Sequence, residues 1–546
     1  MTSRRPDLTG SRRPDLTGPA LTYPAHVLDL LEPRLAGAGP AVVDRDGGLD
    51  YPELREWSDA VAAALRDRGV RRDEPVLVHT RLSRWAVVGM LGVLRAGARY
   101  VAVDAAFPVR RQHQLAESSG ARVVLAQPGL PPLPDRHDTL VLDALPTPST
   151  TRAARRGTLA YTCFTSGSTG RPKGVTISAA ALAYSTAARL GYYPEPVTAY
   201  LLCSSISFDS SVAGIYWTLA CGGTLVVPSD RPTDLVAVGE AASRYAASHL
   251  LMVPSLYGVA LRGGLARQLG SLRTVIVAGE SCPPELVGRH LAALPQARLY
   301  NEYGPTECTV WSTVHACRPA DAEGRSVPIG GPIPGTRVYV CGEDGGPVPA
   351  GEIGELCIGG PGLAVSREPA DGPTDHTGDG DPDGNRVGQP GDGDPDGRAE
   401  SGDREAFGVL GGERVYRTGD LVSVRADGAL DFHGRADFQL KLGGVRVERA
   451  EIAHALGTAD GVTAAGVGVV SDPEPGGRGG RHRLVGFVVP AADPLDRRRL
   501  REHLLALLPA AALPARIELV AALPRLPNGK IDNTELDRRG RALLAG

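Results

Sequence analysis

Short apolar runs alternate with helix-like stretches from about residue 21 to residue 434, and this alternation most limits the folds open to the chain. Pro75–Val78 has the length and composition of a buried strand. The apolar residues of Leu54–Leu65 recur at helical spacing, and Gly69 marks the end of that helix. Parallel strands joined by covering helices have this pattern, so we predict an α/β fold with mostly parallel sheets. Further strand-like runs are Arg122–Leu125, Tyr200–Cys203, Thr224–Val227, Leu250–Val253 and Val275–Ala278.

The composition divides the chain into a leader, a core, an insertion and a small C-terminal domain. Residues 1–20 carry a tandem SRRPDLTG repeat, which is too short to form a stacked repeat fold and predicts a disordered leader. Residues 369–403 hold GDGDPDG twice and almost no apolar side chain, so a disordered insertion is predicted there. The predicted core covers residues 21–434. Residues 435–546 regain a globular composition and predict a small, mobile α+β domain.

Charge and apolar content exclude several classes of protein. With 59 Lys and Arg against 62 Asp and Glu, the net charge of −3 gives no strongly basic surface for nucleic acid. The longest uncharged apolar run, Ala86–Leu94, is about half the length of a membrane-spanning helix. The N-terminal residues lack the apolar stretch of a secretory signal, and the eight cysteines form no Cys-x-x-Cys pair. We therefore expect a cytoplasmic protein with no nucleic-acid or membrane partner.

The run Tyr161–Gly174 leads into a dense Ser/Thr/Gly loop that contains a lysine. Glycines let the backbone approach an anion closely, and hydroxyl and amide groups supply donors, so the loop predicts a phosphate cradle. Its spacing differs from that of a Walker loop. A flexible linker is the alternative, but the Pro-Lys-Gly sequence beside apolar strand residues disfavours it. The basic residues of the chain include only three lysines, which suit sites that need a compact charge: Lys173, Lys441 and Lys530.

This loop resembles the phosphate loop of the adenylate-forming superfamily, which includes acyl-CoA synthetases, luciferases and the adenylation domains of nonribosomal peptide synthetases. Further motifs of that superfamily follow in order, and together they cover about Leu49–Leu536. The chain looks like a free-standing adenylation domain, which implies a large α/β core with a small barrel-like part and a mobile lid domain. The matching segments are Leu49–Leu54, Gly92–Asp104, Asn301–Glu307, Gly354–Gly360, Tyr416–Leu421, Gly434–Gln439 and Leu526–Asp532.

The resemblance implies a site that binds ATP and Mg²⁺ and joins a carboxylate to the α-phosphate. Two anions meet in that reaction, so the site must neutralise charge and hold both groups in line. Catalysis is assigned to Lys530, Thr306 and Glu307, with Glu307 as the Mg²⁺ ligand. Taken singly, Asp420 could cap a helix and Lys530 could be an exposed turn residue. Nucleotide contacts, with Tyr303 on adenine and Asp420 on the ribose, are assigned to Thr165, Ser166, Gly167, Ser168, Thr169, Gly170, Lys173, Asn301, Tyr303, Gly304, Asp420 and Arg435.

The segment Phe208–Val212 is similar to the one that marks amino-acid activation, where the aspartate pairs with the substrate ammonium. Two such buried charges are stable only as a pair, although Asp209 could alternatively be a helix cap. Glu302 is a carboxylate in an otherwise apolar pocket. We therefore expect an amino acid with a polar or basic end, or a phenol, and a β-amino acid stays open. The pocket implied by the resemblance consists of Asp209, Ser210, Ala213, Leu251, Ile276, Ala278, Glu302, Val310, Trp311 and Lys530.

The resemblance also implies a second step, in which the activated acyl group passes to the phosphopantetheine thiol of a carrier protein. The small domain would rotate about Asp437, withdraw Lys530 and bring in the loop that holds Lys441 and Gly444. Gly443 departs from the arginine common at this place. Because no carrier-like segment follows Lys530, we expect the carrier to be a separate protein. Two other functions stay open: a CoA ligase for a carboxylic acid without an amino group, and a non-catalytic scaffold on the same fold.

Overall fold

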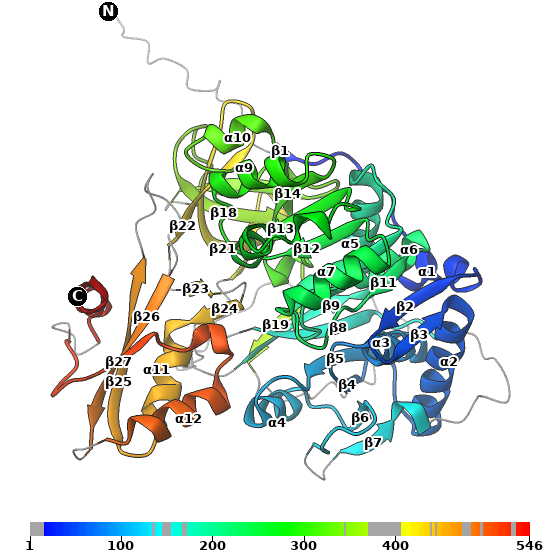
Figure 1. The fold of residues 1–546 in the computed structure, drawn as a ribbon, viewed down its shortest axis with the longest axis horizontal. Coiled ribbons are helices and arrows are strands. Elements are labelled where there is room, and N and C mark those ends of the chain that lie inside the picture. The colour runs from blue at the N-terminus through cyan, green and yellow to red at the C-terminus, as the bar shows by residue number, and fades with distance from the viewer. Residues whose placement is uncertain are drawn as a thin grey trace, which may run out of the picture.

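The computed structural model shows a large core with a smaller C-terminal part beside it (Figure 1). Residues 1–15, and residues 370–403 of the predicted insertion, lie outside the part of the chain that the structure describes. The described residues are 16–133, 137–144, 154–165, 172–342, 345–369, 406–436, 439–442, 445–471, 482–491, 495–525 and 531–545.

The core contains two mixed sheets in which parallel pairing predominates, so the predicted α/β fold class is confirmed. The first sheet has the strand order β19-β9-β8-β5-β4-β6-β7. Its strands pair in parallel from β8 to β7, whereas β9 pairs antiparallel with both β8 and β19. The strands are β4 (Pro75–Thr80), β5 (Arg99–Asp104), β6 (Val123–Ala126), β7 (Asp138–Val141), β8 (Leu159–Thr165), β9 (Lys173–Ser178) and β19 (Ser366–Pro369).

The second mixed sheet has the order β16-β15-β14-β13-β12-β10-β11-β2-β3. Pairing is parallel from β14 to β2, and the sheet ends in antiparallel strands on both sides. The strands are β2 (Pro40–Asp44), β3 (Gly47–Asp50), β10 (Ala199–Leu201), β11 (Thr224–Val226), β12 (His249–Met252), β13 (Thr274–Ala278), β14 (Arg298–Tyr303), β15 (Thr313–Ala316) and β16 (Gly331–Pro332).

Helices α3, α5 and α6 are buried on nearly all sides because they pack in one hydrophobic cluster with strands of both mixed sheets. None of the helices that the structure describes is long and apolar enough to cross a membrane. The helices of the core are α1 (Leu28–Leu35), α2 (Tyr51–Asp67), α3 (Arg84–Ala96), α4 (Val109–Ser118), α5 (Ala179–Tyr192), α6 (Asp209–Cys221), α7 (Leu235–Arg244), α8 (Pro254–Arg262), α9 (Pro284–Ala293) and α10 (Pro319–Glu323), with short 3-10 turns η1 (Leu142–Ala144), η2 (Leu265–Arg267) and η3 (Thr306–Cys308).

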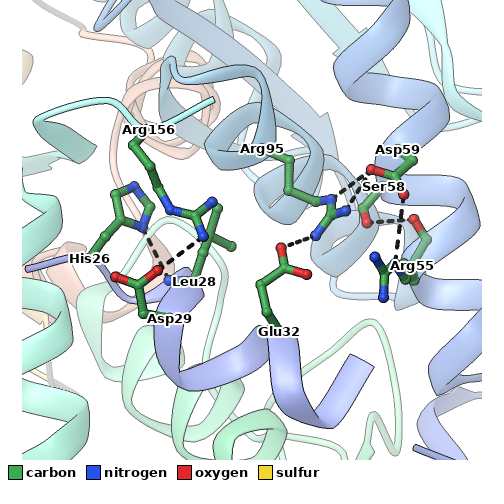
Figure 2. A network of polar contacts seen from close by, with 9 residues as sticks. All are labelled: His26, Leu28, Asp29, Glu32, Arg55, Ser58, Asp59, Arg95 and Arg156. Carbon is green, nitrogen blue, oxygen red and sulfur yellow. Dashed lines mark hydrogen bonds and ion pairs between the residues drawn. The ribbon is translucent and has the colours of Figure 1, made fainter. Parts of the chain in front are cut away.

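A buried arginine joins the first three helices (Figure 2). Arg95 on α3 donates to Asp59 on α2 at 2.6 and 2.9 Å and also to Glu32 on α1. On the same helix α1, Asp29 accepts from Arg156 at 3.0 Å. Only 2% of the Arg95 side chain is exposed, so its charge depends on these carboxylates. The network fixes α1 and α2 against α3, which in turn packs on the first sheet.

A third sheet is antiparallel and corrects the expected barrel-like part. Its order is β1-β17-β18-β21-β20, with β22 on β21. No pairing among the strands that the structure describes closes this sheet on itself, so it is an open sheet. The strands are β1 (Leu16–Thr17), β17 (Arg337–Cys341), β18 (Gly354–Gly359), β20 (Phe407–Leu410), β21 (Glu413–Val424) and β22 (Leu430–Arg435).

Strand β1 also corrects the predicted leader, which was expected to run to residue 20. Leu16 and Thr17 pair antiparallel with β17. Gly18 continues this contact through a hydrogen bond from its N–H to the Thr336 carbonyl at 2.9 Å. A Cβ on Gly18 would lie 1.9 Å from the Ile333 carbonyl oxygen, so only glycine fits. Backbone pairing with the third sheet therefore orders this polar segment.

The C-terminal part has its own core, formed by a three-stranded sheet and two flanking helices. It meets the large core at α4, where Arg111 lies 3.4 Å from Glu451 of α11. The β23–β24 hairpin and α11 lie on the side that faces the large core, whereas the C-terminal helix lies on the far side (Figure 1). The elements are β23 (Gln439–Leu442), β24 (Val445–Glu448), β25 (Val462–Ser471), β26 (His482–Pro490), β27 (Arg516–Leu519), α11 (Arg449–Gly457), α12 (Arg497–Leu507), α13 (Asn533–Ala545) and the turn η4 (Ala510–Ala512).

Candidate active site

Asp209 is the first residue of α6, where the loop after β10 enters the core. Ser207 ties this loop to β5, because its hydroxyl accepts from the Asp104 N–H at 2.9 Å. The Thr306 side chain is a close neighbour of the Asp209 carboxylate. Burial raises the pKa of Asp209 to about 6; the Thr306 hydroxyl lowers it in part, and the nearby Glu307 charge raises it further. A cation that reached this carboxylate would stabilise its ionised form.

The two predicted catalytic residues of η3 lie in a strained turn after β14. Thr309 and Val310 have φ angles of 56° and 80°, which are rare for β-branched residues. Gly304 lets the arms of the turn touch, since a Cβ there would lie 2.4 Å from the Cα of Trp311. Backbone strain of this kind persists only where surrounding contacts hold it, and such strain clusters at functional sites.

Glu307 is fully buried, and its carboxylate lies 3.0 Å from the Nε of Arg367 on β19. β19 pairs with β9, whose first residue is the buried Lys173. Thr165, the last residue of β8, stands opposite Lys173 in register. Lys173 therefore begins a strand beside the predicted phosphate loop. The pairing of β8, β9 and β19 thus brings the cations Lys173 and Arg367 and the hydroxyl of Thr165 to the edge of the sheet that contacts η3.

The residues assigned to the ribose are directly paired with one another. Asp420 and Arg435 stand opposite in register on β21 and β22, and the guanidinium donates to the carboxylate at 2.7 Å. Arg435 also donates to the Thr418 carbonyl at 2.9 Å. The Tyr303 hydroxyl donates to the other Asp420 oxygen. Nearby, the Asn301 amide donates to a backbone carbonyl at 2.9 Å, so it holds the strand end in place.

The residues of the implied amino-acid pocket come from four elements and mostly share one hydrophobic cluster. Val310 packs against this cluster, and Ser210 is half-buried beside Asp209. Ala278 on β13 stands opposite Glu302 on β14. A small pocket opens at Asp209, lined on its other sides by residues of β5, β8 and the loop before α6. The members buried in the cluster are Ala213, Leu251, Ile276 and Trp311.

The contacts of Glu302 change what was expected of the substrate side chain. Its two oxygens accept from both terminal nitrogens of Arg189 at 2.6 and 2.9 Å, and one also accepts from the Tyr193 hydroxyl. The protein itself thus supplies the cation and the phenol that the sequence analysis assigned to the substrate. Of the expected polar, basic or phenolic side chains, the basic one loses its basis, because a carboxylate with these partners needs no further cation.

Several predicted site residues lie outside the residues that the structure describes. These are Ser166–Gly170 of the phosphate loop, the catalytic Lys530, the hinge Asp437 and Gly444. The backbone of Lys441 belongs to β23. Their assigned roles stay predictions.

The structure adds residues that the motifs did not single out. Arg189 and Arg367 each neutralise a predicted site carboxylate, and Asp104 anchors the loop before Asp209. No local pattern marks the two arginines among the many others in the chain, because their partners lie far away in sequence. Asp104 is the last residue of Gly92–Asp104, a segment that already resembles the superfamily. That resemblance was the one sequence signal for any of these three added residues.

Comparison with protein families agrees with this arrangement. A family described as "AMP-binding enzyme" matches residues 35–366, and one described as "AMP-binding enzyme C-terminal domain" matches residues 451–530. The chain belongs to the AMP-binding enzyme family. The resemblance to adenylate-forming enzymes is thereby confirmed.

Curated relatives of this AMP-binding enzyme act in natural-product synthesis. The chain is 37% identical over 510 residues to the AMB antimetabolite synthetase AmbB of Pseudomonas aeruginosa, covering 91% of this chain and 37% of AmbB. It is 34% identical over 522 residues to novobiocin biosynthesis protein H of Streptomyces niveus, covering 91% of this chain and 80% of that protein. The chain spans only 6% and 37% of the first two curated relatives that it matches.

A solved structure shows the same architecture as this AMP-binding enzyme. Holo-PA1221, a nonribosomal peptide synthetase protein with adenylation and PCP domains, superposes with a TM-score of 0.76 at 25% identity. The match covers 94% of this chain and 84% of PA1221. Such a TM-score indicates that the core and the C-terminal part follow the fold of adenylate-forming enzymes.

Proposed function

We propose that this AMP-binding enzyme activates an amino acid as its aminoacyl-AMP and then passes it to the phosphopantetheine thiol of a carrier protein. The contact between Asp209 and Thr306 carries the proposal. It sets a carboxylate suited to an ammonium beside Thr306, one of the residues to which catalysis is assigned. An amino acid carries its ammonium and its carboxylate on neighbouring atoms, so one small substrate reaches both groups.

The electrostatics of Asp209 favour a cationic substrate group. Burial makes the ionised carboxylate costly in the free protein, as its raised pKa shows. An ammonium that arrives without a counter-ion would be equally costly to bury. Together the two charges offset each other's desolvation, whereas a neutral acid would leave Asp209 unpaired.

The residues around Glu307 fit a Mg²⁺ that binds together with ATP. One carboxylate completed by phosphate and water oxygens is a donor set that Mg²⁺ commonly accepts. Glu307 would hold the ion, whose positive charge opposes the negative charge that develops on the phosphates. Thr165 and Lys173 lie at the strand edge next to η3, where a hydroxyl and an ammonium can bind phosphate oxygens.

The Asp420 carboxylate would bind the ribose. Arg435 and Tyr303 would hold that carboxylate in place. Each carboxylate oxygen can accept two hydrogen bonds, so one site on each stays open to a ribose hydroxyl. Burial and the Asp420 charge raise the pKa of Tyr303 well above its usual value. The phenol therefore stays protonated and keeps donating to Asp420.

The observed placement of the C-terminal part supports a second step on a carrier. The hairpin that contains Lys441 faces the large core, and the helix after Lys530 lies on the far side (Figure 1). This is the arrangement that the resemblance assigns to acyl transfer. The similarity to PA1221, which contains adenylation and PCP domains, also favours a carrier as acceptor.

Amino-acid-dependent exchange of labelled pyrophosphate into ATP tests the first step. We expect exchange with at least one amino acid and at least ~10²-fold less with the analogue that lacks the amino group, because Asp209 loses its partner. The matched control is Asp209→Asn, which should remove that discrimination. Exchange that prefers the acid without an amino group would favour a CoA ligase. No exchange with any acid would favour a scaffold.

A further inference from the structure

Glu302, which the resemblance assigns to the amino-acid pocket, forms a buried ion pair with Arg189. Arg189 and Glu302 form two parallel hydrogen bonds, and 1% of each side chain is exposed. Bidentate contacts of this kind are the strong form of the arginine–carboxylate pair. Tyr193 adds a third donor to Glu302. Three of the four acceptor places on this carboxylate are therefore filled from within the protein.

Aromatic side chains enclose the arginine. The guanidinium carbon of Arg189 lies 4.3 Å from the Trp311 ring centre and 5.7 Å from that of Trp217. Tyr193 stacks on Trp311 with its ring centre 5.8 Å away. Burial opposes the charge on Arg189, yet Glu302 more than offsets this and keeps the arginine pKa above its usual value. The buried pair thus carries no net charge.

We propose that Arg189 determines substrate specificity by neutralising Glu302, so that the pocket takes an amino acid with an uncharged side chain. This inference rests on the proposed function and deepens it. A basic side chain would bring a second cation toward Arg189 in a region of low dielectric, where like charges repel strongly. Removal of Arg189 alone would leave Glu302 as a buried carboxylate that needs a cation.

Pyrophosphate exchange with a panel of neutral, acidic and basic amino acids tests the inference. The wild-type enzyme should prefer neutral over basic amino acids by at least ~10-fold in kcat/KM, as expected for placing a cation beside a paired arginine. Arg189→Met should raise the ratio of basic to neutral turnover by at least ~10-fold, because the Glu302 charge becomes available. The double variant with Arg189→Met and Glu302→Gln should lose that gain.

Arg95→Met is a matched control, since Arg95 is a similarly buried arginine paired with carboxylates of α1 and α2, helices to which no pocket residue is assigned. It should lower stability without changing the ratio of basic to neutral turnover. If Arg189→Met fails to fold, the double variant with Arg189→Met and Glu302→Gln provides the test. It has no charge at these two positions, so it should still prefer neutral over basic amino acids. A wild-type enzyme that prefers basic amino acids, or an active Arg189→Met with an unchanged ratio, overturns the inference.

The outcome is separable from failure of the proposed function. If the wild-type enzyme shows no pyrophosphate exchange with any amino acid, that result contradicts amino-acid activation. Pyrophosphate exchange with neutral and cationic carboxylic acids that lack an α-amino group would then test the role of Arg189. The ratio of cationic to neutral turnover should again rise with Arg189→Met and fall back in the double variant.

Discussion

Thr306 lies close enough to the Asp209 carboxylate to lower its pKa, so two groups with separate proposed partners are neighbours in the fold. Asp209 begins α6, which is buried between the two mixed sheets, and Thr306 lies in the turn that follows β14. Because Asp209 and Thr306 are neighbours, a substrate ammonium bound at Asp209 would lie close to the reacting phosphate.

The raised pKa of Asp209 predicts an acid limb in the pH profile. Below pH 6 the carboxyl binds a proton and can no longer pair with an ammonium. The kcat/KM for amino-acid-dependent exchange should therefore fall about tenfold per pH unit below about pH 6. Profiles from pH 5 to 8.5 measure this. Asp209→Asn should show low activity without the break at pH 6, and a wild-type profile that is level down to pH 5 would contradict the assignment.

The same shift predicts that Asp209→Asn stabilises the substrate-free protein at neutral pH. A carboxyl with a raised pKa contributes most to stability below its ordinary pKa of 3.8, and this contribution is lost as the pH rises through about 6. Removing the charge should therefore add roughly 1–3 kcal/mol at pH 8. Thermal unfolding at pH 5 and pH 8 measures it. An equal gain at both pH values would point to packing and not to charge.

We predict that Arg367 competes with the proposed Mg²⁺ for Glu307, because its guanidinium lies 3.0 Å from that carboxylate. Arg367→Gln should tighten the Mg²⁺ dependence of ATP binding by roughly fivefold, equivalent to about 1 kcal/mol. Calorimetric titration of ATP at a series of Mg²⁺ concentrations measures this without turnover. Arg414→Gln is the matched control, since Arg414 donates to the nearby Ala364 carbonyl instead. Weaker ATP binding at every Mg²⁺ concentration would show that Arg367 binds phosphate directly.

The Arg111–Glu451 pair should help to hold the C-terminal part in its observed placement. Burial raises the pKa of Glu451, and Arg111 offsets this in part. Arg111→Met should therefore weaken docking by about 1–3 kcal/mol at pH 8. The effect should shrink toward pH 5, because protonation removes the buried charge. Small-angle scattering can follow the separation of the two parts.

Two variants control the docking experiment. Arg110→Met changes an exposed neighbour on the same helix and should leave the scattering profile unchanged. Adding Glu451→Gln to Arg111→Met should restore much of the docking, since no unpaired charge remains. Equal loss of docking in both Arg111 variants at both pH values would assign the effect to packing.

Arg95→Met should destabilise the core by about 3 kcal/mol at pH 8, because Asp59 and Glu32 lose their shared cation. Part of the loss should disappear near pH 5, where the stranded carboxylates can take up protons. Thermal unfolding at the two pH values tests this. Arg55→Met, which removes a more exposed partner 3.9 Å from Asp59, should cost much less.

Much of the fold could be predicted from local patterns. The strand-like run at Val275–Ala278 lies within β13, and the helical spacing of Leu54–Leu65 lies within α2. Burial on a sheet or a helix face imposes its own period on the sequence, so such elements can be found without knowledge of their neighbours. The segment Leu16–Thr17 escaped this approach, because its order comes from pairing with a strand more than three hundred residues away.

The sequence by itself determined the family, because motifs such as Asn301–Glu307 and Tyr416–Leu421 are contiguous and keep their order. Only the tertiary structure decided which charges meet. Glu302 has an apolar neighbourhood in sequence, and nothing local to it indicates Arg189 as its partner. Electrostatic pairing depends on distance in space, and packing of α5 within the hydrophobic core sets that distance. Taken from sequence, this carboxylate left a basic side chain open for the substrate beside a polar or phenolic one; with its partner known, it supports our proposal of an uncharged side chain.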